Sequence, residues 1–266
     1  MKVLSKKNCQ MLSSYYNNNF FDLRIHTPFR VFRRIPWRDI MNVEHRLECN
    51  ICGWRGPYAA LTSDRRERWC PHCKAGNRHR LIAWYLTEKH PDALAKGNRF
   101  LHVAPERSLG RCLKAVPGLI YESCDIERRD VTHRIDLQSE IISEAAFDVI
   151  LINHVLEHIP NDRAALRNIF TMLRPNGLCV ITVPIRPNGQ PTDEDPSITT
   201  EAERERRFGQ HDHVRFYGED LIERIRAEGF FGEILRSADV EPAVVERYSM
   251  AGEMLFLARR PESGAR

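Results

Sequence analysis

The sequence predicts an α/β protein that is built around a mostly parallel sheet and carries a small cysteine module near its start. From residue 99 onward, short apolar segments bounded by turn residues alternate with segments of helical apolar spacing. This alternation is typical of a parallel sheet with helices on both faces. Four of the eight cysteines form two C-x-x-C pairs before residue 74. We therefore expect a poorly ordered basic arm over 1–45, the cysteine module over 46–76, a linking helix over 77–98, the α/β domain over 99–260 and a tail over 261–266.

Length and composition place the chain among globular proteins. It has 266 residues, of which 42% are hydrophobic and 29% are charged, a balance that excludes a disordered tail or a fibrous repeat. The apolar segments are far shorter than the roughly 18–20 residues needed to cross a bilayer, and the first residues contain no apolar signal segment. We therefore expect a cytoplasmic protein with no membrane span.

The paired cysteines Cys49, Cys52, Cys70 and Cys73 predict a zinc ribbon. Two knuckles of this spacing place four thiolates where they converge tetrahedrally on Zn²⁺ at about 2.3 Å. The alternative is a pair of disulfides, which a reducing cytosol would not maintain. Four thiolate ligands leave no open coordination position, so the predicted zinc is structural and cannot activate water.

The expected helices and strands follow from the apolar pattern in chain order. Helical spacing links the cysteine module to the sheet from residue 77 to about residue 89. Strands are expected at 100–104, 119–124, 131–136, 147–153 and 178–185, helices at 107–116, 163–173 and 219–228, and a closing pair of strands at 230–235 and 254–258.

Two blocks of the α/β segment resemble the class I S-adenosylmethionine-dependent methyltransferases. Residues 147–160 read FDVILINHVLEHIP and residues 173–177 read LRPNG, similar to the fourth-strand and pre-fifth-strand motifs of the large methyltransferase type 11 group. With the cysteine ribbon and the late block QHDHVR at 210–215, the chain resembles bacterial methyltransferases that carry an N-terminal zinc ribbon. The resemblance covers residues 99–260. It implies a Rossmann-like methyltransferase sheet, mostly parallel with the last strand antiparallel, and S-adenosylmethionine as the cofactor.

Residues at the ends of the predicted strands are the candidates for cofactor binding, because ligands of open parallel sheets bind beyond the carboxyl ends of the strands. Asp125 ends the second strand and suits an acid that accepts hydrogen bonds from ribose hydroxyls. The resemblance implies that Asp136, followed by Leu137, contacts the adenine amino group. Asn153 and His154 end the fourth strand and would face the sulfonium and the acceptor. Without the resemblance, the favoured explanations are a helix-capping role for Asp125 and a polar edge of the core for Asn153 and His154.

The loop after the first strand departs from the family pattern. Family members have an acid followed by G-x-G-x-G, because glycines let the backbone approach the methionine portion of the cofactor. Here residues 102–106 read HVAPE. We expect His102 and Ala104 to bind the cofactor, with Ala104 small enough for the turn, and Glu106 to pair with the cofactor's ammonium. A glutamate in this place is also explained by the helix dipole.

The long polar connection between residues 185 and 216 contains two further candidates. A connection of this length is typical of a lid or binding loop, and its charged run at 204–207 is expected to be solvated. His211 and His213 can accept a proton from a hydroxyl or amine near neutral pH. We therefore take His154, His213 and His211 as the candidate catalytic residues.

His154, Glu157 and His158 also spell H-x-x-E-H, the signature of inverted zinc peptidases. That signature requires two histidines on one face of a helix, whereas this motif begins at a strand end. The methyltransferase resemblance also explains these residues without a metal. We therefore do not expect a zinc peptidase.

The sequence thus predicts methyl transfer to an oxygen or nitrogen of a small-molecule or glycan acceptor. An RNA acceptor is the alternative, because residues 1–90 carry ten more basic than acidic residues while the remainder carries six more acidic than basic, and a basic surface suits phosphates. The small net charge of +4 favours the small acceptor, and no DNA partner is expected. A third hypothesis, based on the altered first loop, is a non-catalytic binding protein with the methyltransferase fold.

Overall fold

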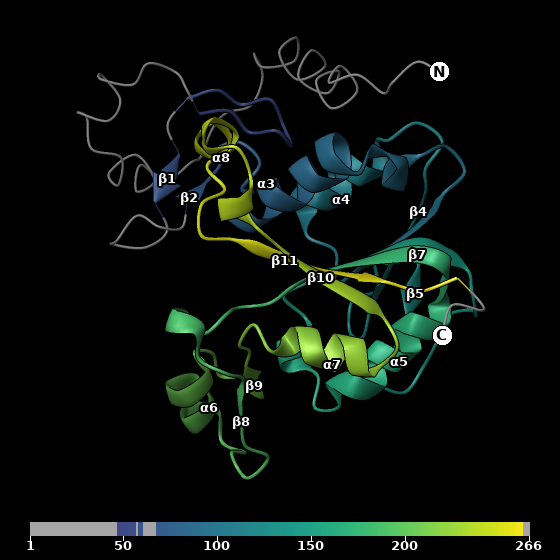
Figure 1. Ribbon diagram of the computed structural model, residues 1–266, viewed down its shortest axis with the longest axis vertical. Helices are drawn as coiled ribbons and strands as arrows, with labels where there is room; N and C mark the ends of the chain where they lie inside the picture. The colour runs from purple at the N-terminus through teal and green to yellow at the C-terminus, as the bar shows by residue number, and fades with distance from the viewer. Residues whose placement is uncertain (1–46, 57, 61–67, 263–266) are drawn as a thin grey trace. The chain divides into compact units, whose positions relative to one another are not determined.

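The computed structural model describes residues 47–56, 58–60 and 68–262 (Figure 1). The arm predicted over 1–45 lies outside the described residues, as does most of the predicted tail. The described residues form two compact units. Unit 1 reaches Leu94 and also takes in Glu106–Pro117 and Arg236–Met254, and unit 2 contains Ala95–Pro105, Gly118–Leu235 and the chain from Leu255 onward.

Unit 1 combines the cysteine module with short helices from three parts of the chain. Its two short strands, β1 (Ala59–Ala60) and β2 (Arg68–Trp69), pair antiparallel. Its helical segments are α3 (Asn77–Trp84), η2 (Tyr85–Lys89), η3 (Pro91–Leu94), α4 (Arg107–Lys114), η6 (Ser237–Asp239) and α8 (Pro242–Tyr248). The linking helix predicted after the cysteines is therefore present, and it continues as a wider π-type turn in η2.

Unit 2 is organised by a seven-stranded sheet in the described part of the chain. The strand order is β10-β11-β7-β6-β3-β4-β5. The strands are β3 (Arg99–Val103), β4 (Ile120–Asp125), β5 (His133–Arg134), β6 (Phe147–Asn153), β7 (Leu173–Thr182), β10 (Phe231–Arg236) and β11 (Met254–Arg259). Strands β5, β4, β3, β6 and β7 pair in parallel, and β11 pairs antiparallel with β7. The predicted mostly parallel sheet with an antiparallel last strand is confirmed.

The core of unit 2 lies in the central strands. Residues Val149, Ile150, Leu151 and Ile152 of β6 are each at most 2% exposed. Because successive side chains of a strand point to opposite faces, both faces of β6 are covered. This explains why the strand reads as a continuous apolar run and why its bounds could be predicted to the residue.

Two helices lie side by side on one face of the sheet (Figure 1). They are α5 (Asp162–Met172) and α7 (Leu221–Ala227). Phe170 of α5 stacks edge to face on Phe230, and Arg163 bonds to Glu228 at the end of α7 at 3.4 Å. Within the described ranges, no helix combines the length and apolar character that a membrane span requires.

The polar connection after β7 has its own small structure. It contains η5 (Pro187–Gly189), β8 (Asp193–Glu194), α6 (Glu201–Phe208) and β9 (Arg215–Phe216), and β8 pairs antiparallel with β9. Residues 205–207 of the charged run are exposed, as predicted, and Arg207 bonds to Asp193 and Asp195, each at 2.8 Å. The connection therefore combines ordered elements with a solvated charged run.

Candidate functional site

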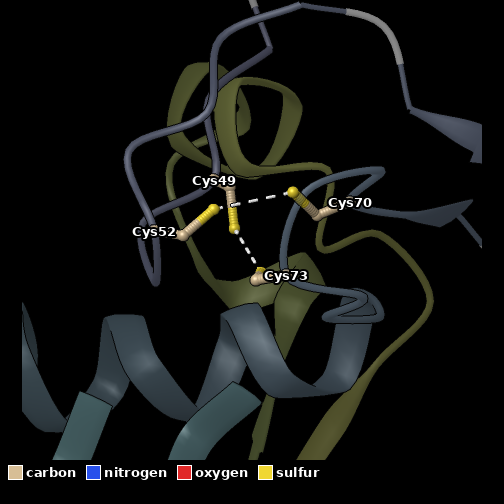
Figure 2. A group of neighbouring side chains, drawn as sticks. All are labelled: Cys49, Cys52, Cys70 and Cys73. Carbon is tan, nitrogen blue, oxygen red and sulfur yellow. Dashed lines mark hydrogen bonds between the residues drawn. The ribbon is translucent and has the colours of Figure 1, made fainter. Parts of the chain in front are cut away.

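Two loops of unit 1 bring four cysteine sulfurs together (Figure 2). The Sγ atoms of Cys49 and Cys73 lie 3.6 Å apart, as do those of Cys52 and Cys70. All four sulfurs lie within 4.8 Å of one another. Four sulfurs bound at about 2.3 Å around one zinc ion would be about 3.8 Å apart, so the spacing fits a tetrahedral site. All four are free cysteines, which contradicts the disulfide alternative.

The same turn holds each cysteine pair. The backbone amide of Gly53 donates to the carbonyl of Cys49 at 2.8 Å, and that of Lys74 donates to the carbonyl of Cys70 at 2.9 Å. The residue after each second cysteine has a positive φ, 74° at Gly53 and 64° at Lys74. Both loops therefore have a backbone geometry that aims the thiols at a common point.

A buried arginine of α3 secures this part of unit 1. Arg80 is 0% exposed. Its guanidinium donates to the carbonyls of Tyr248 at 2.5 Å, Ala75 at 2.6 Å and Ser249 at 3.0 Å. It also donates to the side chain of Asn77 at 2.8 Å. Arg80 thus ties the second cysteine loop to the end of α8, and buried charge is stable only with such full hydrogen bonding.

The strand order of unit 2 reverses between β3 and β6, which is where open parallel sheets bind ligands. Each strand is followed there by a residue with positive φ, 45° at Ala104 and 53° at His154. The amide of Ala104 donates to the carbonyl of Cys124 at 2.8 Å, and that of His154 donates to the carbonyl of Thr182 at 2.9 Å. Ala104 therefore makes the left-handed turn for which glycine is the usual residue.

Asp125 ends β4 and organises the turn that follows. Its Oδ1 accepts hydrogen bonds from the backbone amides of Glu127 at 2.8 Å and Arg128 at 3.0 Å. Asp125 therefore holds a turn, and no helix follows it that it could cap. Both bonds use the same oxygen, so the described residues leave Oδ2 for a ligand.

Asp136 is also engaged in a turn of its own. Its carboxylate accepts from the backbone and side-chain amides of Gln138, each at 3.0 Å. Leu137 is buried at 5% exposure, and its carbonyl accepts from the side chain of Asn168 at 2.8 Å. These bonds fix the position of the loop after β5 on helix α5.

Asn153 is buried at the end of β6, at 3% exposure. Its side-chain oxygen accepts a hydrogen bond from the hydroxyl of Thr182 at the end of β7. The side chain thus bridges two strand ends next to the sharp turn at His154.

Two residues that were predicted to bind the cofactor, His102 and Glu106, lie against other side chains of the protein. His102 is fully buried within β3, and its Nδ1 lies 3.1 Å from the hydroxyl of Tyr121. Its side chain is therefore a core residue. Glu106 precedes α4 in unit 1, where its carboxylate lies 3.7 Å from Nε2 of His79.

A carboxylate and two imidazoles gather beyond the end of β6 in unit 2. Atoms of Glu157, His158 and His213 that could bind a metal lie within 4.8 Å of one another, and we call these residues the Glu–His–His group. Glu157 and His158 lie on the short 3-10 turn η4 (Leu156–His158), so the H-x-x-E-H motif is not on an α-helix and the peptidase interpretation does not fit. Burial lowers the pKa of His158.

The three predicted catalytic histidines occupy different environments. His154 is partly exposed, and its Nδ1 lies 3.5 Å from Oε1 of Glu157. His213 is buried at 6% exposure and donates from Nδ1 to the carbonyl of Phe208 at 3.0 Å. His211 is exposed. The structure thus brings His154 and His213 into the surroundings of Glu157, a residue that sequence reasoning did not propose for the site.

The fold agrees with a comparison against known families. Residues 111–230 match the family model described as a methyltransferase domain. The matched segment contains Asp125, Asp136, Asn153, His154 and the Glu–His–His group. Over these residues the chain is similar to methyltransferase domains, and its sheet has the Rossmann-like fold of the class I methyltransferases.

Solved methyltransferase structures are similar to this chain at low identity. A candidate sarcosine dimethylglycine methyltransferase from Galdieria sulphuraria is 13% identical with a TM-score of 0.51, covering 74% of this chain and 93% of that chain. The 1,6-didemethyltoxoflavin N1-methyltransferase of Burkholderia thailandensis, solved with its substrate and S-adenosylhomocysteine, is 17% identical (TM-score 0.44; 70% and 87% covered). A candidate methyltransferase from Bacillus halodurans is 15% identical (TM-score 0.43; 66% and 98% covered). The comparison with curated proteins found no match.

Sequence reasoning missed two residues of this region: Glu157, and Asp212, whose Oδ2 lies 3.0 Å from Nδ1 of His158. A glutamate inside an apolar block, followed by histidine, was explained by the family motif alone. Glu157 is buried at 1% exposure, and a buried glutamate requires a hydrogen-bonding or cationic environment. Its burial, however, is visible only in the folded chain.

Proposed function

We propose that the protein transfers a methyl group from S-adenosylmethionine to an oxygen or nitrogen of a small-molecule or glycan acceptor, and that a structural zinc ion holds its cysteine module. S-adenosylmethionine supplies a methyl group carried on a positively charged sulfur. The observation that carries the proposal is the pair of sharp turns at Ala104 and His154, on either side of the point where the strand order reverses.

The residues present fit an adenosyl cofactor in two respects. Ala104 has the backbone conformation that a glycine would supply, with only a methyl group as its side chain. Asp125 keeps Oδ2 for a ribose hydroxyl while Oδ1 holds its turn. Asp136 and Leu137 would position the adenine, and Asn153 would line the region between the strand ends.

The acceptor would be oriented and deprotonated by residues after β6. His154 is placed at the strand end with a partly exposed imidazole, and a histidine near neutral pH can take the proton of a hydroxyl or amine. Glu157, 3.5 Å from Nδ1 of His154, would stabilise the imidazolium that forms. Positioning of the two reactants supplies most of the rate enhancement in such a displacement.

The zinc proposal depends on the four converging thiols. Two of the sulfur–sulfur separations are 3.6 Å, close to the edge of a zinc–sulfur tetrahedron, and all lie within 4.8 Å. Such an ion would have no open position, so its role is to hold the two loops of unit 1 together.

Calorimetric titration of the full chain with S-adenosylhomocysteine tests the cofactor proposal. We expect micromolar binding by the natural sequence. Asp125→Asn keeps an oxygen for the two backbone amides but replaces Oδ2 by a donor, so we expect binding to weaken about 10- to 100-fold. Glu127→Gln removes the same charge from an exposed position two residues away and should bind like the natural protein.

Two results would contradict the cofactor proposal. Absence of binding at millimolar S-adenosylhomocysteine would favour the non-catalytic binding protein. Equal affinities of Asp125→Asn and Glu127→Gln would remove Asp125 from the site. An RNA acceptor would instead appear as methylation of RNA that weakens steeply with salt.

A further inference from the structure

The Glu–His–His group joins two segments that are far apart in the sequence. Glu157 and His158 come from η4, directly after the end of β6, and His213 comes from the segment between α6 and β9. Glu157 is 1% exposed and His213 is 6% exposed, whereas the side chain of His158 is 31% exposed. The group is therefore buried on one side and open to solvent on the side of His158.

Both imidazoles of the group are oriented through Nδ1. Nδ1 of His213 lies 3.0 Å from the carbonyl oxygen of Phe208, and Nδ1 of His158 lies 3.0 Å from Oδ2 of Asp212. A carbonyl and a carboxylate oxygen can only accept, so Nδ1 carries the hydrogen in both rings. The lone pair of each neutral ring is then on Nε2, and an Nδ1–H held by an oxygen is the arrangement found around metal-binding histidines.

A buried arginine fixes the spacing of the two segments. Arg215 is 4% exposed and donates to the carbonyls of Leu156 at 3.0 Å, Ile159 at 2.5 Å and Pro160 at 2.7 Å. The amide of Val214 donates to the carbonyl of Glu157 at 2.9 Å. The backbone carrying His213 is therefore bonded directly to the turn that carries the other two residues, so the group is preorganised.

We propose that Glu157, His158 and His213 bind one divalent transition-metal ion, at a site separate from the cysteine cluster. Two imidazoles and one carboxylate are a donor set that suits zinc, iron(II), cobalt(II) or nickel(II). Three protein ligands leave coordination positions open, which the four-cysteine site does not. The ligand set also differs from that of the H-x-x-E-H peptidases, because His213 replaces His154 and Glu157 is a ligand rather than a base.

An open position at this site would serve the proposed methyl transfer. An acceptor hydroxyl bound to a cation loses its proton to solvent or to a base more readily, because the cation stabilises the resulting anion. His154 stands beside Glu157 to receive that proton. This role at the acceptor rests on the proposed function, whereas the metal site itself does not.

Cobalt(II) titration of the full chain, with zinc retained in the cysteine cluster, tests the site. We expect one equivalent to bind with the weak visible absorption of nitrogen and oxygen ligands and without the intense ultraviolet band of thiolate ligands. The double variant His158→Gln, His213→Gln should lose this equivalent. His211→Gln, which removes an exposed histidine of the same segment, should retain it.

A second variant does not disturb the buried side of the group. The side chain of Asp212 is 46% exposed, so Asp212→Ala should fold normally, and loss of a carboxylate behind a ligating histidine should weaken cobalt binding about 10- to 100-fold. The proposal is overturned if the natural protein binds no cobalt beyond the cysteine cluster, or if Asp212→Ala and the double variant bind it as tightly as His211→Gln. S-adenosylhomocysteine titration of the same samples reports the cofactor site separately, so failure of either proposal is distinguishable.

Discussion

At the residue scale, the functional turns depend on residues that adopt backbone conformations usually left to glycine. Ala104, His154 and Lys74 all have positive φ, and each follows a strand or knuckle that positions a candidate ligand or cofactor group. A left-handed conformation costs a non-glycine residue roughly 1 kcal/mol. Seven non-glycine residues of the described chain have positive φ, and these three are the ones that lie next to candidate site residues.

Substitution of Ala104 tests whether its turn requires a small side chain for stability and for cofactor binding. Ala104→Gly removes the strain of the left-handed conformation but increases the conformational entropy of the unfolded chain. We therefore expect the free energy of unfolding to change by less than about 1 kcal/mol and cofactor binding to persist. Ala104→Val puts a β-branched side chain at a φ of 45°, so we expect a loss of about 2 kcal/mol or more and weakened S-adenosylhomocysteine binding. Urea unfolding and calorimetry measure both effects. Tight cofactor binding by Ala104→Val would show that the cofactor does not approach this turn.

The residues that the sequence identified best are those whose chemistry depends on local spacing. The two C-x-x-C pairs predicted the converging thiols of Cys49 and Cys73, because a knuckle is a local turn. The positive φ of Ala104 was implied only indirectly, by the missing glycines of the family pattern. The approach of His213 to Glu157 could not be predicted, because the intervening connection folds back through the bonds of Arg215, a long-range arrangement with no sequence periodicity.

At the element scale, the strands that are buried on both faces were the most predictable. β6 has the predicted bounds, and β3 and β4 differ by one residue at each end. β7 begins earlier than predicted, at Leu173, because Leu173 pairs with Phe147 ahead of an irregularity in the register. Helices α6 and α8 were not predicted. α6 has a single buried residue, Phe208, so its apolar pattern is too sparse to predict a helix.

A partly buried ionic network attaches the polar connection to the sheet domain. Glu194 of β8 bonds to Arg224 of α7 at 2.7 Å and to Arg215 of β9 at 3.0 Å. Asp162 of α5 bonds to the same Arg224 at 3.1 Å and accepts from the hydroxyl of Tyr217 at 2.7 Å. The connection is therefore anchored at the side that carries His213, and its attachment depends on charge.

The stability of Glu194→Gln at different pH values tests whether this attachment depends on the charge of Glu194. The hydrogen bond from Arg224, followed by that from Arg215, lowers the pKa of Glu194 from 4.5 to about 2. A lowered pKa stabilises the fold fully above pH 4.5, and this stabilisation is lost as the pH falls toward 2. Because the side chain is 38% exposed, screening limits the effect to about 1 kcal/mol.

We therefore expect Glu194→Gln to be about 1 kcal/mol less stable than the natural protein at pH 7, with the difference shrinking as the pH falls below 4.5. Urea unfolding at several pH values measures it. Glu205→Gln, on the exposed face of α6, should show little difference at any of them. A constant difference for Glu194→Gln across this range would mean that the carboxylate acts through packing rather than charge.

At the scale of the whole molecule, the candidate metal sites of the two units differ in how many coordination positions they leave open. The four thiols of unit 1 close the coordination sphere of a zinc ion, whereas the Glu–His–His group of unit 2 would leave part of it open. The short strands of unit 1, each of two residues, provide few backbone hydrogen bonds to hold the cysteine loops. We therefore expect the structure of these loops to depend on zinc, and the sheet of unit 2 to be independent of it.

Hydrogen exchange after zinc removal by a strong chelator tests this division. The amides of Gly53, Cys70 and Lys74 are bonded within the cysteine loops, so their exchange should accelerate by orders of magnitude, while the paired amides of β6 and β7 should remain protected. Cys52→Ser should show the same fast exchange without a chelator, because three thiolates bind zinc less tightly than four. Cys112→Ser, which alters a buried cysteine of α4 outside the cluster, should not. If the loops stay protected in chelator while Cys52→Ser exchanges fast, the cysteine side chain stabilises them by packing, and the proposal of a structural zinc ion is wrong.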